Sequence, residues 1–221
     1  GNFGRIVVAD IDHRLVDAVK ESKGSYCINI AHKDGIEVSK INDIEILNPN
    51  IDCDRKILLE ALSQSTEIVT SLPSVSFYDV GANNVASLIA DGLGNSKASA
   101  TILYTAENNN HAAEILQKLV NQKPGSFSDD RVQFLNTVIG KMSQIVTEPR
   151  IIERMCLTPL VDGISRAFLV EELSRILVTE CRIKGFVPGI KVFIEKNNLL
   201  PFEEAKLYGH NAIHALLGCL G

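Results

Sequence analysis

Residues 67–71 read Glu-Ile-Val-Thr-Ser, and residues 100–104 read Ala-Thr-Ile-Leu-Tyr. Both are short apolar runs rich in β-branched or aromatic side chains, which is typical of strands buried in a parallel sheet. The segment between them, residues 77–93, predicts a helix, because Val80, Val85, Leu88 and Ile89 form an apolar stripe along it. Strand, helix and strand in this order indicate a parallel α/β sheet wound by right-handed crossovers.

The same alternation extends from this core in both directions. Residues 6–9 (Ile-Val-Val-Ala) predict another buried parallel strand, and residues 15–20, 54–64 and 111–120 predict helices. We therefore expect a Rossmann-like dinucleotide-binding domain over residues 1–125.

After residue 125 the regular alternation of predicted strands and helices ends. We expect a helix over residues 132–142, an extended segment over 143–147 and a strand over 176–179. A long helix is predicted from Leu200 onward, with Pro201 in its first turn. Residues 126–221 are therefore expected to hold the end of the nucleotide domain and the start of a mainly α-helical substrate domain, which is incomplete here.

Composition and charge narrow the classes of function. The chain is 45% hydrophobic and 22% charged, with a net charge of −5, so it has no basic stripe for a nucleic acid to bind. No apolar run approaches the roughly 20 residues that a membrane span needs. The five cysteines are scattered and odd in number, which favours reduced thiols in a cytoplasmic protein. No carboxylate and histidine cluster has metal-ligand spacing, so we expect a metal-free mechanism.

The first residues suggest a nucleotide site. Gly1-Asn2-Phe3-Gly4-Arg5 is similar to the end of a glycine-rich turn, in which backbone N–H groups approach a pyrophosphate. Asp10 ends the first predicted strand and would accept hydrogen bonds from the adenosine ribose, which favours NAD over NADP. Each signal is weak by itself, since two-glycine turns and acidic strand ends are common.

The spacing of these residues raises a physical objection. The acidic residue normally follows the glycine turn by roughly 20 residues, because a whole helix crosses between the two strands. Asp10 follows Gly4 by only six positions. Either the interpretation of the glycines is wrong, or roughly a dozen residues between Arg5 and Ile6 are absent from the sequence; we favour the second alternative.

The predicted C-terminal helix carries a second candidate site. Lys206, Asn211 and His214 follow one another at i, i+5 and i+8, which on an α-helix places them at about 0°, 140° and 80°. A lysine acts as general acid/base when its pKa is lowered, and an amide and an imidazole can bind the reacting oxygen. His210 lies on the same face and is a candidate substrate contact. From spacing alone, a solvated helix face explains the pattern at least as well.

Residues 206–214 (Lys-Leu-Tyr-Gly-His-Asn-Ala-Ile-His) carry the K-x-x-x-x-N-x-x-H pattern, and on this basis the chain resembles the mannitol dehydrogenase family, the polyol-specific long-chain dehydrogenases and reductases. Residues 1–5 resemble the G-N-x-G-R turn of the mannitol-1-phosphate 5-dehydrogenase branch of that family. Other landmarks fall in the family's order over most of the chain, at residues 8–18, 25–26, 68–71, 106–108 and 134–138.

The resemblance implies a role for each matching residue. Lys206 would be the acid/base, with Asn211 and His214 holding the substrate oxygens. Residues 1–4, Asp10, Glu107 and Asn108 would bind the cofactor NAD, and Asn136 the substrate. The chain departs from the family at Gly140-Lys141, where the family has an Asp-Arg pair whose carboxylate helps to order the site.

The expected activity is reversible hydride transfer between NAD and a sugar alcohol, with mannitol 1-phosphate and fructose 6-phosphate as the expected pair. Within the same class, a mannitol 2-dehydrogenase or a tagaturonate or fructuronate reductase remains an alternative. From another class, the Gly140-Lys141 departure favours a nucleotide-binding module without turnover. We expect a small-molecule polyol or sugar phosphate as the partner, with no nucleic acid and no membrane, and the sequence leaves the oligomeric state open, a monomer included.

Overall fold

The computed structural model describes residues 3–124, 127, 130–172 and 175–220, and for residues 210, 211 and 214 it describes the backbone only. The chain divides into two compact units, each made of two segments. Unit 1 comprises residues 1–58 and 141–174, and unit 2 comprises residues 59–140 and 175–221. The division differs from a single boundary near residue 125, because each unit is completed by a later part of the chain.

Unit 2 contains the strands predicted at residues 67–71 and 100–104. Its five-stranded sheet has the order β11-β10-β7-β6-β5. β5, β6 and β7 are parallel, with Val69 beside Tyr104 and Tyr104 beside Leu135. β10 is antiparallel to β7 and parallel to β11. The strands are β5 (Glu67–Thr70), β6 (Thr101–Thr105), β7 (Val132–Val138), β10 (Ile176–Thr179) and β11 (Phe193–Lys196).

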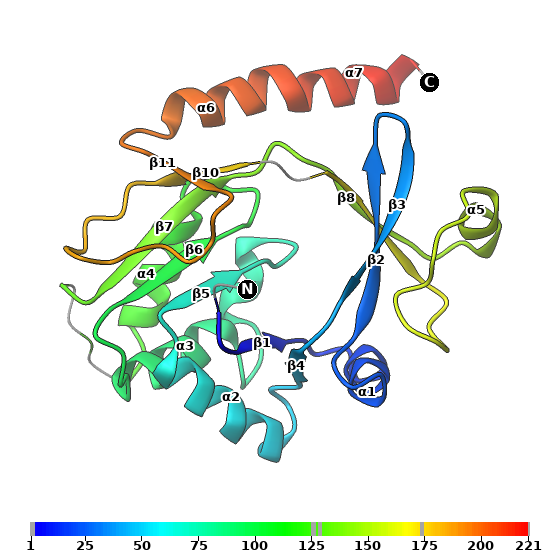
Figure 1. Cartoon of the computed structure of the whole chain (residues 1–221). Helices are drawn as coiled ribbons and strands as arrows, with labels where there is room; N and C mark the ends of the chain where they lie inside the picture. Colours follow the sequence, from blue (N-terminus) through cyan, green and yellow to red (C-terminus); the bar gives the residue numbers. More distant parts are fainter. Residues whose placement is uncertain (1–2, 125–126, 128–129, 173–174, 221) are drawn as a thin grey trace. The chain divides into compact units, whose positions relative to one another are not determined.

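Two helices and a short turn cover one face of this sheet (Figure 1). Leu103 and Phe134 point from the sheet into a core that contains Ile89 and Leu116 from the helices and the fully buried Tyr78. The elements that supply this core are the 3₁₀ turn η1 (Val75–Asp79), α3 (Val85–Gly94) and α4 (Ala112–Asn121). The opposite face packs against residues of the segment 181–193, among them Phe193, whose ring meets Tyr104 edge-on at 4.6 Å between centroids.

Two predictions for unit 2 are wrong in detail. Residues 132–142 do not form a helix, because β7 pairs with β6 on one side and with β10 on the other, and this pairing overrides the local pattern. The helix predicted over residues 77–93 is broken in the middle. Gly81 has a φ of +87°, and the Asn84 side chain accepts from the N–H of Ser87, so a new helix begins there.

Unit 1 holds two smaller sheets. β1 and β4 pair in parallel, and a second sheet has the order β3-β2-β9-β8. In the second sheet β2 and β3 form an antiparallel hairpin, while β2 and β9 are parallel. Their bounds are β1 (Ile6–Ala9), β2 (Tyr26–His32), β3 (Gly35–Ile41), β4 (Ile44–Leu47), β8 (Ser143–Val146) and β9 (Ala167–Glu171).

The helices of unit 1 are α1 (His13–Glu21), the first part of α2 (Asp52–Gln64) and α5 (Pro149–Arg154). Asp12 caps α1, since its carboxylate accepts from the N–H groups of Arg14 and Leu15. β1 was expected to be buried, but Ile6 is 45% exposed and Val8 36%. The reason is that β4 is its one strand partner in the described chain, so its other edge is unpaired.

The helix predicted from Leu200 is confirmed, with one change of geometry. It consists of α6 (Leu200–Ala205), the π-helical segment η2 (Lys206–Asn211) and α7 (Ala212–Leu220), and Pro201 lies in its first turn. In a π-helix the hydrogen bonds join residues five apart, so positions 206 and 211 lie nearer to one face than the roughly 140° of an α-helix would place them. Among the described residues, no helix is both long and apolar enough to cross a membrane.

Candidate active site

Lys206 and Asn108 meet in unit 2. The Lys206 ammonium donates a hydrogen bond from Nζ to Asn108 Oδ1 at 2.7 Å, although the two residues are 98 positions apart in sequence. Asn108 follows β6 at the carboxyl ends of the parallel strands, which is where ligands bind to open α/β sheets. Lys206 is half-buried, and this burial lowers the pKa of its amine. A lysine in this state is closer to the pKa that a general acid/base needs.

Glu203 is a buried carboxyl group one turn before Lys206 on the same helix. The Glu203 residue is 9% exposed, and this burial raises the pKa of its carboxyl group. The nearby Glu114 raises this pKa as well, whereas His111 lowers it. Glu203 is not among the site residues predicted from the sequence. Its spacing of three residues from Lys206 was the signal that could have placed both side chains on one face.

The side chain of Glu107, a predicted cofactor residue, is bound within the protein. It is 4% exposed, and its carboxylate accepts three hydrogen bonds: from Tyr78 Oη at 2.5 Å, from the Leu72 N–H at 2.9 Å and from Thr70 Oγ1 at 3.0 Å. These donors occupy the carboxylate from inside the protein. The Glu107 side chain therefore anchors the loop after β6 to the end of β5, and its cofactor contact stays a prediction.

The side-chain amide of Asn136 likewise forms hydrogen bonds within the protein. Its Oδ1 accepts from the Ala113 N–H at 2.9 Å, and its Nδ2 donates to Glu114 Oε2 at 2.9 Å. Both partners lie in the first turn of α4, so the Asn136 amide caps that helix from the end of β7. The substrate contact of Asn136 stays a prediction.

Asn211, His214 and His210 remain predictions. Their backbones continue the helix of Lys206, Asn211 as the last residue of η2 and His214 in α7. Their side chains lie outside the described part of the structure.

Of the predicted cofactor residues, Phe3, Gly4 and Asp10 lie in unit 1, Glu107 and Asn108 lie in unit 2, and Gly1 and Asn2 fall outside the described residues. Phe3 is exposed, and Gly4 is followed directly by Arg5 and β1 with no helix between them, so Gly4 does not precede a helix N-terminus here. Arg5 forms an ion pair with Glu45 at 2.7 Å. Between Gly4 and Asp10 the described chain therefore lacks the helix that normally lies between a glycine-rich turn and the acidic residue that follows it. The cofactor role of the turn stays a prediction.

Asp10 is placed as predicted, at the carboxyl end of a parallel strand. Its N–H donates to the Leu47 carbonyl at 3.0 Å, and its Oδ1 accepts from the Asp12 N–H at 2.8 Å. The carboxylate is half-buried. Its ribose contact stays a prediction.

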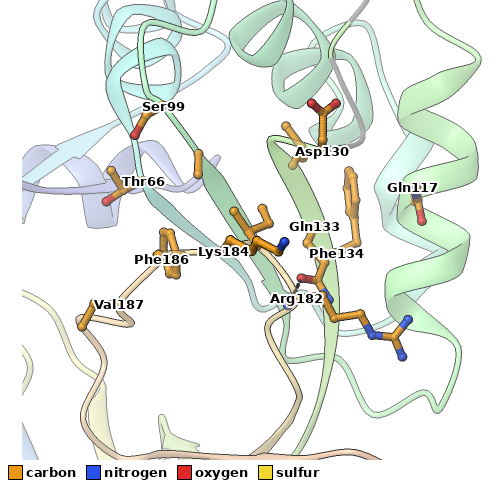
Figure 2. Close-up of a pocket in the computed structure, with 14 residues that line it drawn as sticks. Thr66, Ser99, Gln117, Asp130, Gln133, Phe134, Arg182, Lys184, Phe186 and Val187 are labelled. Carbon is orange, nitrogen blue, oxygen red and sulfur yellow. Dashed lines mark hydrogen bonds between the residues drawn. The ribbon is translucent and has the colours of Figure 1, made fainter.

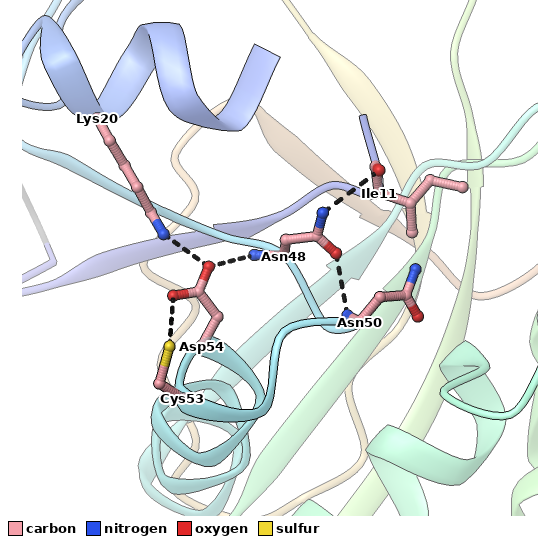
Figure 3. Close-up of polar contacts among 6 residues, drawn as sticks. All are labelled: Ile11, Lys20, Asn48, Asn50, Cys53 and Asp54. Carbon is pink, nitrogen blue, oxygen red and sulfur yellow. Dashed lines mark hydrogen bonds and ion pairs between the residues drawn. The ribbon is translucent and has the colours of Figure 1, made fainter. Parts of the chain in front are cut away.

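A polar cluster organises the neighbouring end of β4 (Figure 3). Asp54 Oδ2 accepts from Lys20 Nζ at 2.6 Å and from the Asn48 N–H at 2.8 Å, and Asn48 Nδ2 donates to the Ile11 carbonyl at 3.4 Å. Burial raises the pKa of Asp54, but the bonds from Asn48 and Lys20 outweigh it and hold the pKa below its usual value. The cluster ties α1, the start of α2 and the loop after β1 together.

A pocket of about 870 Å³ lies elsewhere in unit 2 (Figure 2). Thr66, Ser99 and Val132 place it at the amino-terminal ends of β5, β6 and β7, and Arg182 and Lys184 contribute from the segment that follows β10. Asn108 follows the opposite end of β6, so this pocket is distinct from the site of Lys206.

Comparisons with known proteins point in the same direction as this geometry. No family model matches the chain. The chain is 23% identical over 218 residues to the mannitol-1-phosphate 5-dehydrogenase of Buchnera aphidicola subsp. Acyrthosiphon pisum, a match that covers 98% of this chain and 52% of that protein. The resemblance to the mannitol dehydrogenase family is confirmed.

Solved structures of polyol dehydrogenases share the fold. Pseudomonas fluorescens mannitol 2-dehydrogenase, in a ternary complex with NAD and D-mannitol, matches with a TM-score of 0.65 and 14% identity over 91% of this chain and 48% of that one. A D-sorbitol dehydrogenase in substrate-free form matches with a TM-score of 0.67 and 10% identity over 91% and 49%. These matches confirm the Rossmann-like α/β fold, and the chain spans about half the length of the relatives it matches.

Proposed function

We propose that this chain is part of an NAD-dependent polyol dehydrogenase in which Lys206 is the catalytic acid/base. The observation that supports it is the half-buried Lys206 amine, which donates to Asn108 at the carboxyl ends of the parallel strands. In alcohol oxidation, neutral Lys206 would take the proton of the substrate hydroxyl. In reduction, the Lys206 ammonium returns that proton to the carbonyl oxygen.

NAD supplies the hydride acceptor when it is bound, and the chain's own residues would hold it. The Asp10 carboxylate suits hydrogen bonds from the adenosine ribose hydroxyls, because it ends a parallel strand and is half-buried. Asn108 would hold Lys206 and contact the nicotinamide region, and Asn211 and His214 would bind the substrate oxygens.

The substrate pair that we propose is mannitol 1-phosphate and fructose 6-phosphate. The support is the G-N-F-G-R sequence at residues 1–5 and the similarity to the Buchnera protein. Free mannitol with fructose, and the hexuronates tagaturonate and fructuronate, are the alternatives within this class.

The test is NADH oxidation by the purified protein with fructose 6-phosphate, fructose, tagaturonate and fructuronate in turn. We expect fructose 6-phosphate to have the highest kcat/KM. Lys206→Ala is expected to abolish turnover and to leave NADH binding nearly unchanged, because it removes only the proton acceptor. Lys118→Ala, on the exposed side of α4, is the matched control and should retain full activity.

A second candidate function is a nucleotide-binding module without turnover, which the Gly140-Lys141 departure favours. In that case NADH would bind but none of the four substrates would be reduced. Unchanged activity in Lys206→Ala would refute the role of that residue.

A further inference from the structure

The Glu107 carboxylate is buried without an ion pair. Three donors surround it, Tyr78 Oη, Thr70 Oγ1 and the Leu72 N–H, and no cationic side chain in the described part of the chain pairs with it. A buried carboxylate is stable only when hydrogen bonds replace its lost hydration. Removing one of these donors therefore destabilises the protein more than removing a donor to an exposed carboxylate would. The three bonds together fix the orientation of the Glu107 side chain.

Tyr78 supplies the shortest of these bonds, at 2.5 Å, and is itself completely buried. Burial and the hydrogen bond to Glu107 raise the pKa of the Tyr78 phenol, so the hydroxyl remains a donor at every physiological pH. A hydroxyl that donates to a carboxylate forms a charge-assisted bond of the stronger class.

The backbone on both sides of Glu107 is also held. The Ala106 N–H donates to the Thr70 carbonyl at 2.9 Å, and the Asn109 N–H donates to the Glu107 carbonyl at 2.8 Å. Asn108 lies between these two contacts and turns its side chain to Lys206. The placement of Asn108 Oδ1 therefore depends on the residue immediately before it.

We propose that Glu107, held by Tyr78, is a positioning residue that acts through Asn108 to set the protonation of Lys206. This inference rests on the proposed function of Lys206. A hydrogen bond to an ammonium group favours its charged form, so the bond from Lys206 to Asn108 opposes the effect of burial on the amine. When Asn108 is displaced, the amine keeps its burial and loses the opposing bond, and its pKa falls further.

The test measures Lys206 directly, without substrate. The labelling rate of the Lys206 amine by an acylating reagent is followed against pH by mass spectrometry of its peptide in four proteins: the unchanged chain, Glu107→Gln, Asn108→Ala and the double variant. We expect both single variants to lower the Lys206 pKa. The double variant should match Asn108→Ala alone, because Glu107 acts through Asn108.

Glu60→Gln makes the same chemical change on an exposed side chain of unit 2 and should leave the Lys206 titration unchanged. If Glu107→Gln does not fold, Tyr78→Phe replaces it, since it keeps the carboxylate and two of its three donors. Folding of each variant is checked by circular dichroism.

Kinetics supply the second readout. In Glu107→Gln we expect kcat to fall by about tenfold and the pH profile of kcat to shift in the same direction as in Asn108→Ala, with the KM for NADH changed by less than about threefold. Two results would overturn the inference: a folded Glu107→Gln protein with an unshifted Lys206 titration, or a double variant in which the two effects add. Because the labelling needs no turnover, it decides this question even if every candidate substrate fails.

Discussion

The buried carboxylate of Asp54 accepts hydrogen bonds from several donors, and it therefore makes the stability of the folded protein depend on pH. Its side chain is 7% exposed and accepts from Lys20 and from the Asn48 N–H, which together lower its pKa below the usual value for aspartate. A carboxyl whose pKa is depressed on folding stabilises the folded state at pH values above its unfolded pKa of about 3.9. This contribution disappears as the pH falls through the folded pKa.

Asp54→Asn is expected to lower the free energy of unfolding by roughly 1–3 kcal/mol at pH 7. The deficit should shrink as the pH falls below about 4, because the unchanged protein then loses the same charge. Urea unfolding of both proteins across this range measures it. Asp52→Asn, in the same helix turn but exposed, is the control and should show a much smaller deficit. A deficit that is constant with pH would show that charge is not the cause.

At the level of elements, the junction between α1 and the strands of unit 1 depends on Gly24. Its φ is +73°, in the left-handed region that favours glycine, and its N–H donates to the Val19 carbonyl to end α1. The Gly24 carbonyl accepts from the Ile44 N–H at 3.1 Å at the start of β4. A Cβ at this position would lie 2.1 Å from the Ile44 carbonyl oxygen.

We expect Gly24→Ala to destabilise the protein by at least about 2 kcal/mol, because backbone strain and a steric clash with main chain add at one residue. Thermal and urea unfolding check this expectation. Gly140→Ala is the matched control: a Cβ there meets nothing within 4 Å, so the change should stay within about 0.5 kcal/mol. Equal losses in the two variants would refute the role of the α1–β4 contact.

At the scale of the whole molecule, the C-terminal helix carries a group of exposed apolar side chains. Five side chains of this helix are between 57% and 76% exposed: Tyr208, Ile213, Leu216, Leu217 and Leu220. Exposed apolar side chains gathered on one element promote association in water.

The 221-residue chain is therefore expected to bind the dye ANS and to sediment as larger species as its concentration rises. Replacing Leu216 and Leu217 by Glu should reduce both effects severalfold, because two charges interrupt the patch. Gln64→Glu with Gln144→Glu adds the same charge at exposed polar positions and should change neither. Dye binding that is equal in both double variants would place the apolar surface elsewhere.

Local pattern was sufficient where each element carries its own periodicity. The strands at Glu67–Thr70 and Thr101–Thr105, the helix α4 and the long helix from Leu200 could all be predicted, because short continuous apolar runs indicate strands and helical spacing of apolar residues indicates helices. The resemblance to the mannitol dehydrogenase family could also be predicted, since residues 206–214 are contiguous. Lys206 was found in this way.

Only the tertiary structure decided the features that depend on distant neighbours. Residues 132–138 form a strand because β6 and β10 lie on either side of it, and no local pattern contains that information. The bond from Lys206 to Asn108 and the burial of Glu107 against Tyr78 join segments separated by 98 and 29 positions. Such contacts depend on how the chain is wound, so the sequence could name Lys206 as a candidate acid/base but not the acceptor that holds its amine.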